Sequence, residues 1–248
     1  MISSGKFRVS EGYSFLWRHK MSNFYFKSGS QSNVVLVAKA AAEGKSYTSK
    51  KDGQQYTILS LTTHQNYVSN GENRVLTQTI PVFVPGTLDV RAGDLVTVTG
   101  ELKVSEVAPK SDKQKYPVSQ VVINNAKAEV VPTDVDFGGI NQAFIIGRVG
   151  NVRQITGKTP GVVVSVAVTK SAKTANGWQD DTSWFEVSMF GKRAEGLQAK
   201  AAKGDLIYVR GRLSQRATKV GSVEKQLLHF GADDFNILKK AAAAAAVS

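Results

Sequence analysis

Ten residues of this chain occur twice, and the repeat is the strongest constraint on its fold. Residues 93–102 (GDLVTVTGEL) align without gaps on residues 204–213 (GDLIYVRGRL), with six of the ten positions identical at an offset of 111. Each copy opens with Gly-Asp and continues as a strand-like segment. Solenoid repeats are only about 20–50 residues long, so this offset does not fit a solenoid. The repeat therefore predicts two copies of one domain.

Short strand-like segments surround both copies. In the first half they are residues 34–38, 55–62, 74–84, 95–102 and 118–123. In the second half they are residues 143–149, 162–169, 182–190, 206–213 and 225–230. About five strands in about 100 residues are typical of a five-stranded Greek-key barrel of the OB type. The predicted fold class is all-β, with two OB-fold barrels in tandem and at most one short helix per barrel.

Only the second half has a clear helical segment. Residues 193–203 are helix-like, and Gly204 ends them as glycine often ends a helix. In the first half only residues 88–90 occupy that place. Residues 170–181 are predicted to form a polar loop that carries Trp178.

The predicted domain boundaries follow changes in composition. They are a basic aromatic extension at 1–32, a first OB domain at 33–131, a linker at 132–140, a second OB domain at 141–238 and an alanine-rich tail at 239–248. Residues 1–30 hold seven of the 21 aromatic residues. Such an extension suits either an arm that stacks bases or a segment that packs on a neighbouring surface. Met21 is an alternative start.

The net charge and the scarcity of cysteine and histidine limit the classes of function that fit this chain. The net charge of +12 favours a polyanionic partner, nucleic acid first. The chain has no cysteine, and its three histidines lack metal-ligand spacing, so we predict no disulfide, metal, cofactor or catalytic site. Acidic residues are scattered, which argues against an enzyme. No apolar run is long enough to span a bilayer, so we expect a cytoplasmic protein with no membrane partner.

The candidate site is a row of aromatics and cations. Trp184 and Phe190 are six residues apart and share one face of a regular strand. Exposed, such rings stack bases while nearby cations neutralise phosphates; the alternative for Trp184 is burial in the core. The second half, with a net charge of +6 against +2, is the better surface. The candidate nucleic-acid-binding residues are Trp178, Trp184, Phe190, Arg148, Arg153, Lys170, Lys173, Arg210, Arg212, Arg216 and Lys219, with Tyr56, Lys50 and Lys51 in the first half.

The second half resembles the bacterial single-stranded-DNA-binding protein family. The resembling segments are Gly147-Arg148-Val149-Gly150, Thr182-Ser183-Trp184-Phe185, Phe190-Gly191-Lys192, Ala194-Glu195, Lys203-Gly204, Tyr208-Val209 and Gly211-Arg212-Leu213 with Arg216. The resemblance implies sequence-independent binding of single-stranded DNA without catalysis, with Trp184 and Phe190 as stacking residues. It also implies four OB folds per assembly, hence a homodimer of this chain, and replication, recombination or repair proteins as partners.

The sequence departs from the family pattern at three places. Lys173 or a neighbour stands where the family has an early loop tryptophan, and Ala217-Thr218 replace a later one. An alanine run replaces the acidic tail that recruits partners. These departures favour an alternative function, an OB-fold adaptor that binds proteins of a primosome, conjugation or replication complex. A nuclease is the third hypothesis.

Overall fold

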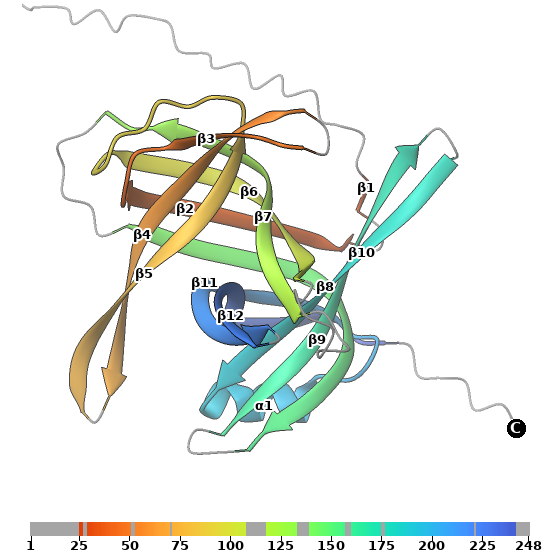
Figure 1. The fold of residues 1–248 in the computed structure, drawn as a ribbon. Helices are drawn as coiled ribbons and strands as arrows, with labels where there is room; N and C mark the ends of the chain where they lie inside the picture. The colour runs from red at the N-terminus through yellow and green to blue at the C-terminus, as the bar shows by residue number, and fades with distance from the viewer. Residues whose placement is uncertain are drawn as a thin grey trace, which may run out of the picture.

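About three quarters of the described residues belong to strands (Figure 1). The fold is that of a computed structural model, which describes residues 25–26, 29–50, 53–69, 71–107, 118–132, 139–156, 160–174, 177–220 and 222–241. Within these ranges there is one helix, α1 (Lys192–Lys200). At nine residues it is much too short to cross a bilayer.

The first barrel is built from an antiparallel sheet that closes on itself. Its strands are β2 (Gln31–Ala40), β3 (Lys45–Thr48), β4 (Gln55–Ser69), β5 (Glu72–Pro85), β6 (Leu95–Val107) and β7 (Val118–Val130). β2 pairs with β4 and β6, β5 pairs with β4, and β7 pairs with β6. Alternate residues point inward, so Leu36, Leu59 and Ile80 are fully buried.

The second barrel repeats this arrangement and adds the helix. Its strands are β8 (Ile140–Ile155), β9 (Gly161–Thr174), β10 (Gly177–Phe190), β11 (Leu206–Val220) and β12 (Val223–Lys239). β8 pairs with β9 and β11, and a parallel contact between Ser188 of β10 and Gly231 of β12 closes the barrel. α1 buries Ala194 and Leu197 against the core. The predicted fold class, two OB barrels in tandem, is confirmed.

The repeated glycines have the same role in both barrels. Gly93 and Gly204 adopt φ values of 90° and 89°, a region that disfavours other residues. The N–H of Gly93 donates to the carbonyl of Ala40 (2.9 Å), and that of Gly204 donates to the carbonyl of Val149 (2.7 Å). Each glycine thus turns the chain into the strand that pairs with the first strand of its barrel, β6 with β2 and β11 with β8.

The aspartates that follow these glycines hold the same turn. A side-chain oxygen of Asp94 accepts from the N–H of Arg91 (2.8 Å), and one of Asp205 accepts from the N–H of Ala202 (2.9 Å). The repeat seen in the sequence is therefore a repeated hydrogen-bonded turn.

The two barrels share one continuous sheet. β2 pairs antiparallel with β8 from Gln31↔Ile146 to Val37↔Ile140, and the two strands lie side by side between the barrels (Figure 1). Residues 31 and 32, predicted to belong to the N-terminal extension, are part of this strand. Ser32 is buried, and its hydroxyl donates to the carbonyl of Leu102 (2.9 Å). The domain boundaries otherwise remain predictions.

Two long hairpins were not fully predicted. Residues 170–181, predicted as a loop, form the outer ends of β9 and β10, which run to Thr174 and from Gly177. β11 likewise continues to Val220. These outer ends extend beyond the barrels, so they carry polar residues and lack the apolar alternation that identifies a core strand.

Only part of the N-terminal extension is described. Tyr25 and Phe26 form β1 (Tyr25–Phe26), which pairs antiparallel with Ser171 and Lys170 of β9. This pairing agrees with the interpretation that the extension packs on a neighbouring surface. The other five aromatics of residues 1–30, and tail residues 242–248, lie outside the described residues.

Asp205 should contribute more stability than its repeat partner Asp94. Asp205 is 1% exposed, and it also accepts from the N–H of Ala241 (2.8 Å) and the ammonium of Lys240 (3.0 Å). The Ala241 and Ala202 N–H groups, and then Lys240, lower the pKa of Asp205. This contribution is present above the ordinary aspartate pKa and is lost as the pH falls through the lowered folded-state pKa.

We therefore expect Asp205→Ala to lower the free energy of unfolding at pH 7 by about 2 kcal/mol, because it leaves two backbone N–H groups without their acceptor. Asp94→Ala removes one such bond at a more exposed turn and serves as the matched control. Urea unfolding of both variants measures the difference. Equal losses in the two variants would contradict this assignment.

Candidate nucleic-acid interface

Three aromatic side chains lie on one face of β10. Trp178, Trp184 and Phe190 are spaced six residues apart, and 54%, 54% and 43% of their surfaces are exposed. The intervening odd-numbered residues Phe185 and Met189 are buried in the core. The alternation of the strand thus turns the three rings outward, and the alternative that Trp184 is a core residue is wrong.

Two of the rings are laid over glycines of neighbouring strands. The indole of Trp184 covers Gly150 of β8, and the ring of Phe190 covers Gly161 of β9. A Cβ at either glycine would overlap the ring that covers it. The glycines therefore let both rings lie close against the sheet while the outer side of each ring stays exposed.

Trp178 lies on a strand and not in the loop predicted for it. It pairs in register with Lys173 of β9, near the tip of the β9–β10 hairpin. Both side chains are exposed, so a ring and a cation lie opposite one another at this end of the aromatic row.

Three guanidinium groups flank the row. Arg148 lies two strands from Trp184 in the register Arg148↔Ala167↔Trp184. Arg153 pairs with Glu186 at 3.4 Å, and both side chains are largely exposed. Nη2 of Arg216 donates to the hydroxyl of Ser188 (3.2 Å), on the outward face of β10. Arg148 and Arg216 bond neutral oxygens here, the carbonyl of Gly204 and this hydroxyl, so their charge is not compensated by these contacts.

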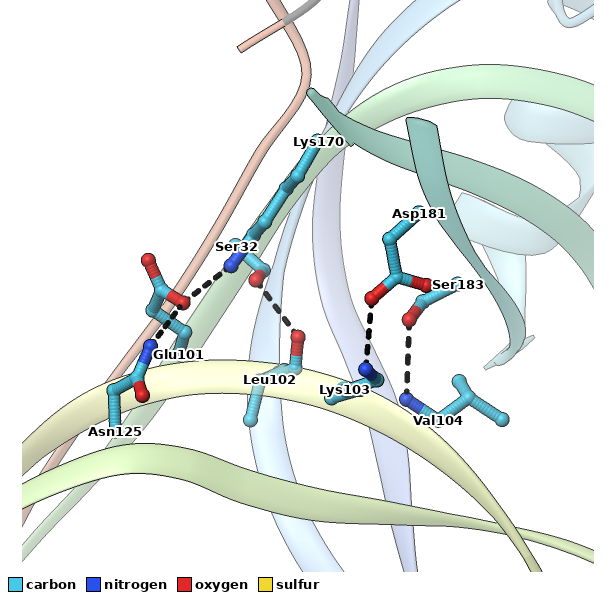
Figure 2. Close-up of polar contacts among 9 residues, drawn as sticks. All are labelled: Ser32, Glu101, Leu102, Lys103, Val104, Asn125, Lys170, Asp181 and Ser183. Atoms are coloured by element: carbon cyan, nitrogen blue, oxygen red, sulfur yellow. Dashed lines mark hydrogen bonds and ion pairs between the residues drawn. The ribbon is translucent and has the colours of Figure 1, made fainter. Parts of the chain in front are cut away.

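Lys170 does not join the aromatic row. It follows the inward-pointing Val168 by two residues, and its ammonium pairs with Glu101 of the first barrel (Figure 2). Its side chain is only 20% exposed. The β9 alternation directs this lysine between the barrels, so it acts as a structural ion pair.

The remaining predicted cations of the second barrel lie on β11. Arg210 pairs with Asp234 at 3.7 Å, and Arg212 makes two bonds to Asp233, at 2.7 and 3.0 Å. Lys219 is exposed near the β11–β12 turn.

The predicted residues of the first barrel are not brought to this row. Tyr56 lies on β4, and Lys50 lies in the turn between β3 and β4. These strands are at the opposite end of the strand order from β10. The hydroxyl of Tyr56 donates to Gln54 (3.3 Å). Lys51 lies outside the described residues.

Among the residues of the first barrel that the structure describes, there is no equivalent row. The buried residues Ile80, Val82 and Val84 of β5 match Phe185, Val187 and Met189 of β10 in order and burial. This match places Thr79 where β10 has Trp184, and Pro85 where it has Phe190. The exposed rings that sequence reasoning missed are Tyr47, Tyr67 and Phe83. Phe83 could have been found from its place between the buried Val82 and Val84.

The imidazole of His229 is half-buried, with its Nε2 atom inside the fold. Burial lowers the pKa of His229, and nearby Arg216 lowers it further. Among the described residues, no group of three or more His, Cys, Asp or Glu is placed to hold a metal ion.

Comparison with known proteins agrees with this geometry. Residues 140–237 match the model of the "Single-strand binding protein family". A single-stranded DNA-binding protein of Aquifex aeolicus is 39% identical over 80 residues, which are 31% of this chain and 54% of that protein. The matched part of the chain thus spans about half the length of this relative.

Two solved structures show the same arrangement of both barrels. They are the wild-type single-stranded DNA binding protein from Thermus aquaticus and a deletion mutant of it. The wild type is 19% identical, with a TM-score of 0.61 over 87% of this chain and 97% of that one. The mutant is 18% identical, with a TM-score of 0.62 over 86% and 97%. At this identity the likeness supports the tandem OB fold. Residues 140–237, which carry the aromatic row, are thus the part of the chain that is similar to the single-strand binding protein family.

Proposed function

We propose that this protein binds single-stranded DNA without sequence preference and without catalysis, in replication, recombination or repair. The observation that carries the proposal is the outward row of β10, in which the rings of Trp184 and Phe190 cover glycines of neighbouring strands. Every base has a π-face, so such a platform accepts any sequence. Arg148, Arg153 and Arg216 flank the row and would neutralise phosphates.

The spacing of the rings suits separate bases. A strand rises about 3.4 Å per residue, so rings six residues apart are separated by roughly 20 Å. Each ring therefore contacts a different nucleotide of an extended strand. We place the protein in the cytoplasm, where DNA replication and repair occur.

Replacing Trp184 should weaken binding directly. We expect Trp184→Ala to lose about 1–3 kcal/mol of binding free energy for oligo-dT, because one stacked base is lost. Phe83→Ala is the matched control, since Phe83 is an exposed ring on the equivalent strand of the other barrel. Fluorescence titration measures both. Parent-like affinity of Trp184→Ala would contradict the stacking role.

Phosphate neutralisation predicts a steep salt dependence. For single strands the logarithm of the binding constant falls by about 0.7 per neutralised phosphate for each tenfold rise in salt. Arg216→Ala should make this slope shallower by about that amount. Lys45→Ala, on β3 of the first barrel, should leave the slope unchanged. Binding that does not respond to salt in the parent protein would refute the proposal.

We also propose that two chains assemble into a homodimer with four OB folds. The outward side of the sheet shared by the barrels carries Val35, Phe144, Ile146 and Tyr208, all only partly buried in the single chain. The rings of Phe144 and Tyr208 lie 5.8 Å apart at the centre of this face. Covering such a face removes apolar surface from water.

The mass in solution tests the dimer. The parent should measure about 53 kDa by light scattering, twice its 26.7 kDa, and Ile146→Glu should measure 26.7 kDa because a charge cannot be buried there unpaired. Gln154→Glu, at the exposed outer end of the same strand and beyond its pairing with β2, is the control. A parent mass of 26.7 kDa would exclude the dimer.

A second candidate is an OB-fold adaptor that binds protein partners in a primosome, conjugation or replication complex. The exposed rings of Tyr47, Tyr67 and Phe83 on the first barrel favour it. Capture of a replication protein by a chain that fails to bind oligo-dT would select this function.

A further inference from the structure

Each barrel sends one long hairpin across to the other barrel. From the β9–β10 hairpin, the hydroxyl of Ser183 accepts from the N–H of Val104 on β6 (3.4 Å). From the β4–β5 hairpin, Gln78 accepts from the N–H of Gln215 on β11 and donates to its carbonyl, both at 3.3 Å. Val104 and Gln215 are 111 residues apart, the offset of the repeat. We call each of these contacts between a hairpin and the other barrel a crossing. The two crossings lie at equivalent positions of a duplicated structure.

The crossing at β6 is sealed by ion pairs (Figure 2). Lys170 pairs with Glu101, and Lys103 pairs with Asp181 at 2.7 Å. Asn125 also donates to Glu101 (3.1 Å). The four charges cancel, and the space left at this crossing is about 180 Å³.

The crossing at β11 has none of those charge pairs at the matching positions. The repeat offset and the hairpin registers match Glu101 with Arg212, Lys103 with Ser214, Lys170 with Gln65, and Asp181 with Leu76. Where β6 has the carboxylate of Glu101, β11 has the guanidinium of Arg212, and where Lys170 faces that carboxylate, the neutral Gln65 stands instead. The result is an open groove of about 560 Å³.

This groove is cationic. Arg193, Arg212 and Arg216 line it together with one carboxylate, Asp233, which gives these four residues a net charge of +2. Asp233 takes up the charge of Arg212 through two hydrogen bonds. Arg193 donates to the backbone carbonyl of Asp233, and Arg216 donates to the hydroxyl of Ser188. Hydrogen bonds to neutral oxygens leave the charge of both guanidinium groups available to an anion.

The groove also continues the aromatic row. Phe190, the last ring of β10, lines it, and Leu76 of the β4–β5 hairpin lines it as well. A strand that stacks on Trp184 and Phe190 would therefore reach these guanidinium groups next.

We propose that this groove is a phosphate-binding channel for single-stranded nucleic acid, with the β4–β5 hairpin of the first barrel as one wall. The inference rests on the proposed function and extends it, because it makes a hairpin of the first barrel part of the site on the second. The strand passes from the β10 rings between Leu76 and Arg216, and its phosphates bind Arg193 and Arg216.

Two neighbouring residues of the hairpin test this channel. Leu76 lines the groove, whereas Val75 is 62% exposed and points to the opposite face of β5. We expect Leu76→Glu to weaken oligo-dT binding on the order of tenfold, because it places a carboxylate beside the phosphates. Val75→Glu makes the same change in net charge and should bind within about twofold of the parent. Melting temperatures of both variants check that the fold is kept.

A cross-linking experiment tests the same channel without introducing a charged residue that could disturb the fold. The chain has no cysteine, so Leu76→Cys and Val75→Cys each carry a photoreactive group at one known place. Oligo-dT should cross-link through residue 76 and not through residue 75.

The outcomes separate the two proposals. If the parent binds oligo-dT but Leu76→Glu and Val75→Glu bind alike, and both cysteines cross-link alike, the channel is wrong and the proposed function stands. If the parent does not bind oligo-dT at all, both are wrong.

Discussion

The antiparallel pairing of β2 with β8 is the interaction on which the rest of the structure depends. It turns two small barrels into one sheet, so the long hairpin of each barrel reaches the other barrel. Neither crossing could exist if the barrels were separated by a free linker. Because backbone hydrogen bonds set the register, side chains 111 residues apart in the sequence occupy matching places.

Duplication followed by divergence explains the division of work between the barrels. β5 and β10 share the same buried residues, yet the outward positions of β5 hold Thr79 and Pro85 where β10 holds Trp184 and Phe190. The core must be filled in both barrels, so it constrains both strands equally. The outward face has no such packing requirement. The outward faces of the two strands can therefore differ, and only that of β10 carries the aromatic row.

Most of the fold could be predicted from local patterns. The Gly-Asp repeat identified the duplicated domain because the same turn requires the same residues, and alternation located the core strands. Residues 170–181 were wrongly predicted to be a loop, because a hairpin that extends outside the barrel has no buried face and so lacks the apolar alternation of a core strand. For the site, the six-residue spacing of Trp184 and Phe190 was sufficient, because parity on a strand puts both rings on one side.

The sequence by itself determined the all-β class through the alternation of its strands, and the two barrels through the ten-residue repeat. It also placed Trp184 and Phe190 on one face of a strand, but it left open whether that face points outward. Only the tertiary structure decided what the cations do. Lys170 and Arg212 are both basic residues on strands, but one seals the barrels against Glu101 and the other lines an open groove beside Arg216. Glu101 is 69 residues from Lys170 in the sequence, so only the folded chain brings the two charges together. The interaction energy of two charges depends on their distance in space, which the sequence does not give.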